Sequence, residues 1–525
     1  MLTRQHTAIF LTSLLLAPLT ALHAADAPKT PDRKPNIIFI LADDLGWRDT
    51  SLYGSTFFET PNIEKLAKRG MMFTQAYAAN PLCSPTRASI MTGLYPARIG
   101  ITTPCCHEPA VRLEARLAAP AAPYQRALQV VSASRLKTEY YTLAEALHDD
   151  GYATGHFGKW HLGPEPYSPL QQGFDVDVPH YPGPGPAGSY VAPWRFNAEL
   201  NFAGQPGEHI EDRMAGEAIK FITANKDKPF FLNYWAFSVH APFDAKADLI
   251  KKYGAKADPD NPQRCPVYGA MVQSLDENVG RLVSALEELQ LAENTVIVFF
   301  SDNGGNMYDR VDGIPPTSNA PLRGGKATIF EGGTREPCVV VWPGKVKPGS
   351  RSDALLSSVD WYPTILDMTG TKPKQEVKFD GVSQTPALLG TGVPRDTAFC
   401  CFPHYIQATG AVPSVWVRRG DWKLIRFFCD SPEQTDRFEL YNLKDDPGET
   451  KNLAAEHPDK VKVYDALITQ HLKDIKAVVP VKNTAYDPAA KVPEPGKKPN
   501  KAAAAKKRSA VKDVRQELEK AGDAM

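Results

Sequence analysis

Two pairs of acidic and amide side chains stand directly after apolar, strand-like segments. The pairs are Asp43-Asp44 after residues 36–42 and Asp302-Asn303 after residues 295–300. Open α/β sheets place ligand sites at the carboxyl ends of their strands, so these side chains could share one site. Three carboxylates and one carboxamide suit a hard divalent cation such as Ca²⁺ or Mg²⁺ rather than zinc. Either pair alone is more often a structural turn, so this prediction depends on both.

A second group of residues suits chemistry on an anion. The segment Cys83-Ser84-Pro85-Thr86-Arg87 contains a candidate nucleophile beside a fixed positive charge. Further along the chain come Lys159, His161, His240 and Lys326. A single lysine or histidine is usually an ordinary surface residue. Gathered in one pocket, these side chains would place positive charge around developing negative oxygens.

The order of these segments resembles the type I sulfatases, which are arylsulfatase-like, formylglycine-dependent members of the alkaline phosphatase superfamily. C-x-P-x-R followed by Thr92-Gly93 is the sulfatase signature, in which the cysteine is oxidised to formylglycine. The resemblance covers most of residues 35–455. Its other blocks are Asp43-Asp44-Leu-Gly46-Trp47-Arg-Asp49, Thr60-Pro-Asn62, Gly158-Lys159-Trp160-His161-Leu162-Gly163, His240-Ala-Pro242, Ser301-Asp302-Asn303-Gly304, Arg323-Gly-Gly325-Lys326 with Glu331-Gly-Gly333, and Leu440-Tyr-Asn-Leu443.

The resemblance implies a sulfuric ester hydrolase and a role for each matching residue. The implied Ca²⁺ ligands are Asp43, Asp44, Asp302, Asn303 and the formylglycine (3-oxoalanine) made from Cys83. The implied catalytic contacts are Arg87 and Lys159 to formylglycine, His161 to its hydroxyl, and His240 and Lys326 to the sulfate oxygens, with Lys159, His240 and Lys326 also binding substrate. An aldehyde hydrate carries two hydroxyls on one carbon. One can attack sulfur and expel the substrate alcohol, giving a covalent sulfate ester, and the other can then be deprotonated so that the aldehyde re-forms and sulfate is released. His161 is the candidate base, and His240 could protonate the leaving alcohol.

Three other features are open to more than one interpretation. Arg195 follows the Pro- and Gly-rich run 179–193 and could contact a substrate anion. His404 could recognise a substrate hydroxyl, although a structural loop explains either residue equally well. Cys105-Cys106-His107 has poor spacing for a metal site, which favours loop packing or a disulfide.

The elements that must position these residues alternate between apolar strands and amphipathic helices. The predicted strands are 36–42, 230–235 and 295–300, and the predicted helices are 61–70, 84–92, 142–150 and 268–289. This alternation predicts an α/β fold with a large, mostly parallel sheet flanked by helices, which the resemblance identifies as alkaline phosphatase-like. A hairpin at 415–419 and 422–428 predicts a smaller C-terminal α+β subdomain.

The chain is predicted to have four parts. They are a signal peptide at 1–25, a catalytic α/β domain at 35–390, a smaller subdomain at 395–480, and a Lys/Ala/Pro-rich tail at 481–525 with a last helix at 511–520. The N-terminal apolar run is too short to span a membrane and is followed by small residues, as in a secretory signal. We therefore expect a secreted or periplasmic protein without stable membrane insertion.

Composition restricts the partners. Lys plus Arg and Asp plus Glu are both 60, so the formal net charge is zero and no nucleic-acid partner is expected. The expected partners are a sulfated small molecule or glycan and the formylglycine-generating machinery that acts on Cys83. A formylglycine phosphonate or phosphodiester hydrolase is the alternative enzyme, and a catalytically silent binder of sulfated glycans is the alternative outside enzymes.

Overall fold

The structure is a computed structural model that describes residues 33–196 and 202–492 of the chain. The predicted signal peptide, the predicted helix at 511–520 and the end of the predicted tail lie outside the described residues. By their contacts, the described residues from Lys34 on belong to one compact unit. In this part of the chain, no helix is long and apolar enough to cross a membrane.

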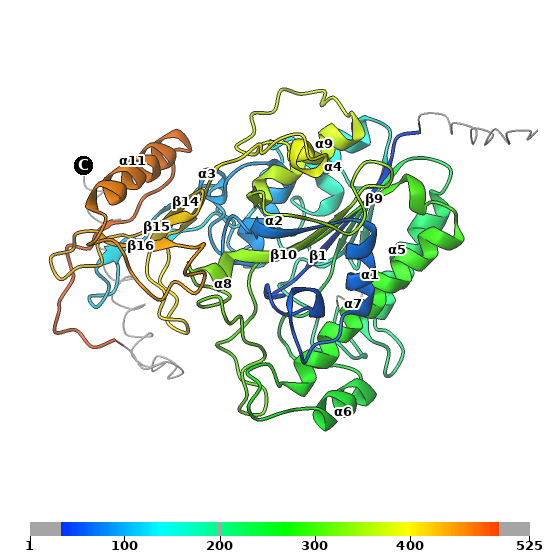
Figure 1. The fold of residues 1–525 in the computed structure, drawn as a ribbon, viewed down its shortest axis with the longest axis horizontal. Coiled ribbons are helices and arrows are strands. Elements are labelled where there is room, and N and C mark those ends of the chain that lie inside the picture. Colours follow the sequence, from blue (N-terminus) through cyan, green and yellow to red (C-terminus); the bar gives the residue numbers. More distant parts are fainter. Residues whose placement is uncertain (1–32, 197–201, 493–525) are drawn as a thin grey trace, which may run out of the picture. The chain divides into compact units, whose positions relative to one another are not determined.

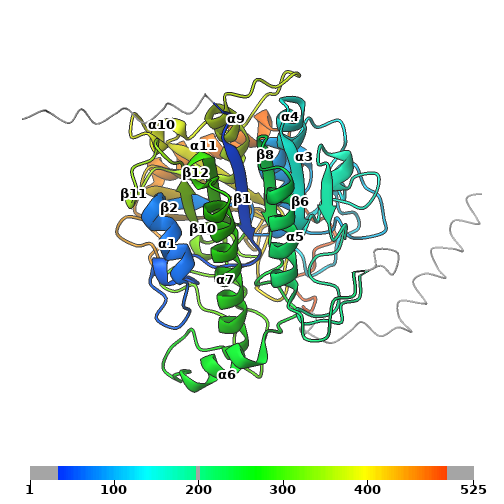
Figure 2. The same cartoon turned by 90° about the vertical axis from the view of Figure 1, so that its right-hand side faces the viewer.

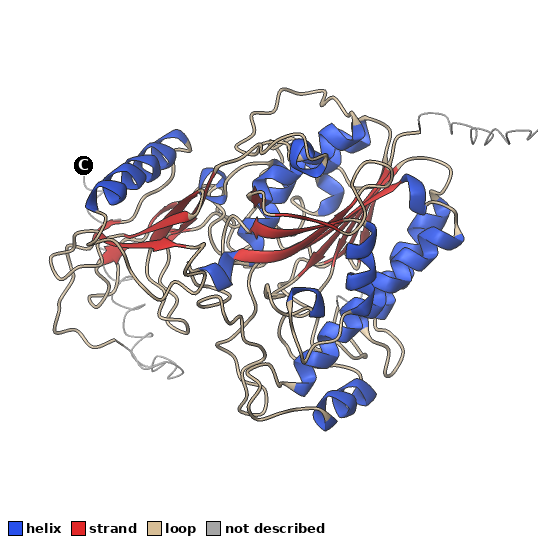
Figure 3. Cartoon of the chain, viewed as in Figure 1, coloured by secondary structure: helices blue, strands red, loops and turns tan. Residues whose placement is uncertain are grey.

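A large, mostly parallel sheet occupies the centre of the fold (Figure 3). Among the described residues it has nine strands in the order β11-β2-β10-β9-β1-β8-β6-β7, with β12 also paired with β2. Of these described strands, β10 alone runs antiparallel to its neighbours, β2 and β9. The strands are β1 (Asn36–Ala42), β2 (Met71–Tyr77), β6 (Ala153–Gly158), β7 (Val176–Val178), β8 (Phe230–Trp235), β9 (Thr295–Ser301), β10 (Arg335–Val341), β11 (Ser350–Ser352) and β12 (Leu356–Ser357).

Helices cover both faces of this sheet (Figures 1 and 2). Successive residues of a strand point to opposite faces, so Ile38 and Ile40 of β1 enter one core while Ile37 and Phe39 enter the other. The first core includes residues of α1 (Pro61–Arg69), α5 (Ile210–Ala224), α6 (Ala247–Ala255) and α7 (Pro266–Glu288). The second includes residues of α2 (Cys83–Thr92), α4 (Leu143–Asp149) and α9 (Trp361–Thr369). The predicted fold class is confirmed, as are the predicted strands and helices that fall within the described residues.

A smaller antiparallel sheet lies beside one end of the large sheet, close to α2 and α8 (Glu331–Thr334) (Figure 1). Its strands are β13 (Thr397–Phe402), β14 (Ser414–Arg419), β15 (Trp422–Phe427) and β16 (Arg437–Asn442), and β14 with β15 is the predicted hairpin. One face packs against α11 (Pro458–Asp474). The other face packs against Leu82 and Ala327, which are the chain neighbours of Cys83 and Lys326. The small sheet therefore supports two segments of the predicted site.

Short elements complete the described fold. They are α3 (Pro96–Ile99), α10 (Thr385–Leu388), β3 (Arg116–Leu117), β4 (Ala127–Leu128), β5 (Val130–Val131), β17 (Val481–Lys482) and 3-10 turns at 51–53, 169–171, 292–294 and 358–360. β3 pairs with β5, and β17 pairs with β4. The chain is thus still paired within the fold at residues 481–482, where the tail is expected to begin.

Candidate active site

The two acidic and amide pairs meet at the carboxyl ends of β1 and β9. These strands are parallel neighbours, with Ala42 in register with Ser301, so the residues that follow them lie side by side. Asn303 Nδ2 donates to Asp44 Oδ1 at 2.8 Å, and the Asp44 amide donates to Asp302 Oδ1 at 3.2 Å. The side-chain oxygens predicted from the sequence to form one cluster are therefore brought together.

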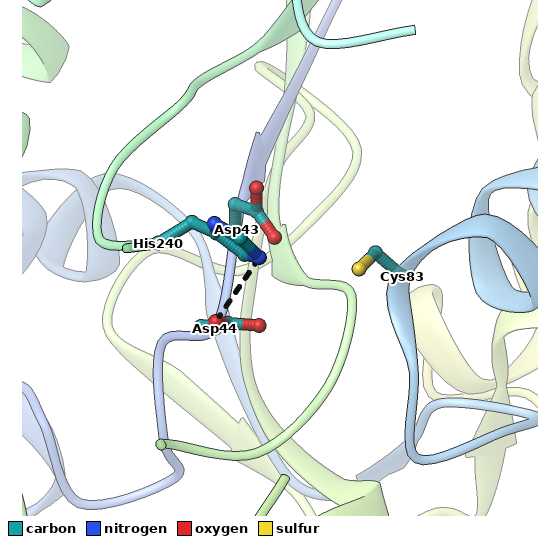
Figure 4. Close-up of side chains that lie close together, drawn as sticks. All are labelled: Asp43, Asp44, Cys83 and His240. Carbon is teal, nitrogen blue, oxygen red and sulfur yellow. Dashed lines mark ion pairs between the residues drawn. The ribbon is translucent and has the colours of Figure 1, made fainter. Parts of the chain in front are cut away.

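Cys83 faces this cluster from the first residue of α2 (Figure 4). Its side chain is 1% exposed. Ligand atoms of Asp43, Asp44, Cys83 and His240 all lie within 4.8 Å of one another. His240 was predicted from the sequence as a sulfate contact, and it enters this group from the loop after β8.

Three buried cations each pair with one of the three carboxylates. Lys159 Nζ lies 2.6 Å from Asp43 Oδ2, and Lys326 Nζ lies 2.5 Å from Asp44 Oδ2. Arg87 contacts Asp302 Oδ2 through Nε at 2.9 Å and through a terminal nitrogen at 2.7 Å. Arg87 also donates to the Lys159 carbonyl at 2.5 Å and lies over the Trp235 ring, 5.1 Å from its centroid. The three positive and three negative charges balance one another.

The segment that carries Lys326 is held close to the end of β9. A Cβ added to Gly304 would lie 1.8 Å from the Gly332 carbonyl oxygen, so only glycine allows this approach. On the side of the small sheet, buried Lys423 of β15 binds Glu331 and Glu449 at 2.9 Å each. Backbone proximity and a buried ion pair therefore both fix the loop around Lys326.

The oxygen cluster fits a divalent cation. Burial raises the pKa of Asp43 in spite of Lys159 and Arg87. Burial and repulsion from Asp43 raise the pKa of Asp302 to about 6. In addition, Asp43 Oδ1 and Asn303 Oδ1 are buried without a hydrogen-bond partner among the described residues. A hard cation would offset the carboxylate repulsion and would use these oxygens as ligands.

A cavity of about 280 Å³ opens onto Cys83. Its lining residues are Leu82, Cys83, Thr103, Pro104, His107, His161, Pro184, His240, Tyr308, Lys326, Ala327 and Ile406. Four of the predicted catalytic residues are among them. Arg87 and Lys159 are fully buried and lie outside the lining, so they act on the cavity through their charge and through the groups they hold.

His240 is held in one tautomer. Its Nδ1 donates to the Ala241 carbonyl at 2.5 Å, and because a carbonyl only accepts, the proton must be on Nδ1. Burial, with Lys326 and Lys159, lowers the pKa of His240 to about 3, which leaves a lone pair on Nε2 near neutral pH. Nε2 lies 3.8 Å from Asp44 Oδ2. To protonate a leaving alcohol, His240 would first have to gain a proton, and a neighbouring anionic substrate would favour this.

His107 contacts His161 and was missed by the sequence interpretation, which assigned Cys105-Cys106-His107 to loop packing or a disulfide. All eight cysteines carry free thiols, and the Cys105 thiol donates to the Ala133 carbonyl at 3.3 Å. His107 Nδ1 lies 2.9 Å from His161 Nε2. The two histidines are 54 residues apart, and no motif or periodicity connects them.

Arg195 and His404 do not line the cavity. Arg195 is exposed on its loop. His404 is buried, its Nε2 lies 2.8 Å from Thr102 Oγ1, and burial lowers its pKa to about 4. Thr102 precedes the lining residue Thr103, so His404 supports the wall of the cavity without facing it. Substrate contacts by these two residues stay predictions.

The chain is similar to known proteins along most of its length. A family model described as "Sulfatase" matches residues 35–371, and one described as "N-sulphoglucosamine sulphohydrolase, C-terminal" matches residues 325–477. The chain is 31% identical to N-acetylgalactosamine-6-sulfatase of Canis lupus familiaris, covering 88% of this chain and 90% of that one. It is 32% identical to arylsulfatase A of Homo sapiens, covering 83% and 87%. The crystal structure of Ps i-CgsB in complex with k-i-k-neocarrahexaose superposes with a TM-score of 0.67 at 28% identity, covering 83% and 92%.

Proposed function

Because this chain belongs to the sulfatase family and is a sulfuric ester hydrolase, we propose that it removes sulfate from a sulfated carbohydrate. We further propose that Cys83 is oxidised to formylglycine by a maturation enzyme and that a calcium ion binds beside it. We also propose that the enzyme is exported to the periplasm or secreted, where it would encounter sulfated polysaccharides.

The observation that carries this proposal is the position of Cys83. Cys83 lines the same cavity as His161, His240 and Lys326, and its sulfur lies next to carboxylate oxygens of the oxygen cluster. A nucleophile made at this position would meet the sulfate group and the cation together. A silent glycan binder would not need three buried cation–carboxylate pairs around a thiol, because such pairs are costly to bury.

Asp43, Asp44, Asp302 and Asn303 would hold the calcium ion together with the side chain of residue 83. When bound, the ion would supply positive charge that acidifies a hydroxyl of residue 83 and stabilises negative oxygens. Lys326 reaches the cavity wall and would bind a sulfate oxygen. Lys159 and Arg87, buried behind the wall, would orient residue 83 and add to the positive potential.

Two of the histidines that line the cavity would move protons. His161 would accept a proton from residue 83 through Nδ1, which is buried without a hydrogen-bond partner among the described residues. His240 would protonate the leaving alcohol through Nε2 once the anionic substrate has raised the pKa of its imidazole. Over the full cycle the two hydroxyls of residue 83 lose two protons and the leaving alcohol gains one. Hydrolysis of a sulfate monoester near neutral pH therefore releases one proton net, together with the alcohol and the sulfate dianion.

A sugar sulfate is the proposed substrate for two reasons. The canine relative is named for N-acetylgalactosamine, and Ps i-CgsB is named in complex with a neocarrahexaose. Galactose- or N-acetylgalactosamine-type units carrying sulfate are therefore the first substrates to assay.

Peptide mass spectrometry across residue 83 tests the proposed nucleophile in protein from a host that can mature it. A loss of about 18 Da relative to cysteine marks conversion of the thiol to an aldehyde. The same preparation should release sulfate from sulfated galactosides and spare matched phosphonate and phosphodiester substrates. An intact thiol with no turnover, or preference for the phosphorus esters, would refute the proposal.

A further inference from the structure

We propose that His107 is a positioning residue that holds His161 in the tautomer needed to accept a proton in the cavity. This rests on the proposed function, because it gives a partner to the proposed base. The contact joins a loop that precedes β3 to the segment that follows β6, and both histidines line the cavity that contains Cys83.

The geometry is that of a hydrogen bond between two imidazoles. His107 Nδ1 and His161 Nε2 are 2.9 Å apart, and the ring planes are inclined by 38°. His161 is fully buried, whereas His107 is exposed. The buried ring is thus anchored at one end by a residue that reaches solvent.

One proton lies between these two nitrogens. Which nitrogen carries it decides whether His161 can accept a proton through Nδ1. If His107 donates, the neutral His161 carries its proton on Nδ1 and has no lone pair for the cavity. If His161 donates from Nε2, Nδ1 is left bare. Nδ1 is the ring atom without a hydrogen-bond partner among the described residues, so in this second arrangement it is a free acceptor on a residue that lines the cavity.

The surrounding charges explain why such a partner is useful. Lys159, Arg87, His240 and His107 face His161, and with burial they lower its pKa well below the ordinary value. His107 in turn faces Glu108, Lys159 and Arg135, and partial burial of its ring is the main cause that lowers its pKa. These positive neighbours therefore disfavour the protonated, positively charged form of His161. The His107 lone pair offsets this, because a hydrogen bond from an ionised donor is about twice as strong as a neutral one.

Two substitutions separate positioning from mere packing. In His107→Asn the side-chain oxygen can still accept from His161 Nε2, whereas His107→Leu has no acceptor. With equal conversion of residue 83 checked by mass spectrometry, His107→Leu should lower kcat by roughly 10- to 100-fold at nearly unchanged KM, and His107→Asn should retain most of it. His148→Leu, on the exposed side of α4, is the matched control and should have no effect.

A second measurement does not depend on turnover. In protein labelled with ¹⁵N-histidine, the imidazole shifts of His161 should show a protonated Nε2 and a bare Nδ1, and His107→Leu should shift that tautomer balance. A wild-type tautomer protonated on Nδ1, full activity of His107→Leu, or equal losses in Asn and Leu would each overturn the proposal. If the matured wild type hydrolyses no sulfate ester, the proposed function fails, while the tautomer still decides whether His107 orients His161.

Discussion

Replacing Arg87 with Met should lower the free energy of unfolding by about 3–5 kcal/mol, because it leaves the carboxylate of Asp302 buried without its cation. Arg87 Nε donates to Asp302 at 2.9 Å, and a terminal nitrogen forms an ion pair with the same carboxylate at 2.7 Å. The guanidinium also donates to the Lys159 carbonyl at 2.5 Å. Met keeps most of the aliphatic volume, so little of the loss would come from a cavity. The effect would therefore report mainly on the charge.

The size of this loss should depend on pH in a way that identifies Asp302. Burial raises the pKa of Asp302 to about 6 even with Arg87 present. A raised carboxyl pKa means stability that is full below the unfolded value and lost as pH rises through the folded value. Without Arg87 the pKa would rise further, so the loss would continue above pH 6. The cost of Arg87→Met should therefore be larger at pH 8 than at pH 5.

Urea denaturation at pH 5 and pH 8, with a chelator so that no divalent cation replaces the missing charge, measures this difference. Arg69→Met is the control, because Arg69 pairs with Glu287 at 2.7 Å while both side chains stay partly exposed. Its cost should be within about 1 kcal/mol and independent of pH. If Arg87→Met cost no more than Arg69→Met, or if its cost did not grow with pH, the account of the buried carboxylates would be refuted.

Three further predictions concern the nucleophile, the metal and a buried acid. Cys83→Ala should abolish sulfate release while changing the free energy of unfolding by only about 1 kcal/mol, as measured in paired activity and urea assays; residual turnover would contradict the role of residue 83. Calcium at 100 times its dissociation constant should stabilise the wild type by about 2.7 kcal/mol in thermal unfolding, and Asn303→Leu should lose most of this gain; an equal gain would remove Asn303 from the ligand set. Burial raises the pKa of Glu211 to about 7, so Glu211→Gln should be more stable than the wild type by about 3 kcal/mol at pH 8 but by less than about 1 kcal/mol at pH 5; the same difference at both would contradict it.

The fold could be predicted from the sequence because its central strands carry a strong local signal. The segments 36–42 and 295–300 are continuously apolar, as expected for strands covered on both faces, and both became central strands. Their pairing with each other could not be predicted, since hydrophobic pattern does not encode which strands are neighbours. The structure shows that these two strands are parallel neighbours with Ala42 in register with Ser301. This pairing brings the two separate acidic pairs together into one cluster.

The histidine contact shows the limit of the same reasoning. His107 lies in a segment without regular secondary structure, where no period of 2 or 3.6 tells which side chains turn inward. Its partnership with His161 depends on how two irregular loops approach each other. Arg195 and His404 also lie in segments of this kind, on an exposed loop and behind the cavity wall, and their substrate contacts stay predictions.

The charge balance of the site explains how a chain with no net charge can act on an anion. Asp43, Asp44 and Asp302 are matched by Lys159, Lys326 and Arg87, so these six side chains sum to zero. A divalent cation among the carboxylates would leave two positive charges in excess, next to a cavity only about 280 Å³ in volume. The excess positive charge would then be confined to the cation site and the adjoining cavity, where the sulfate group would bind. Affinity for the anionic ester should therefore fall steeply on chelation.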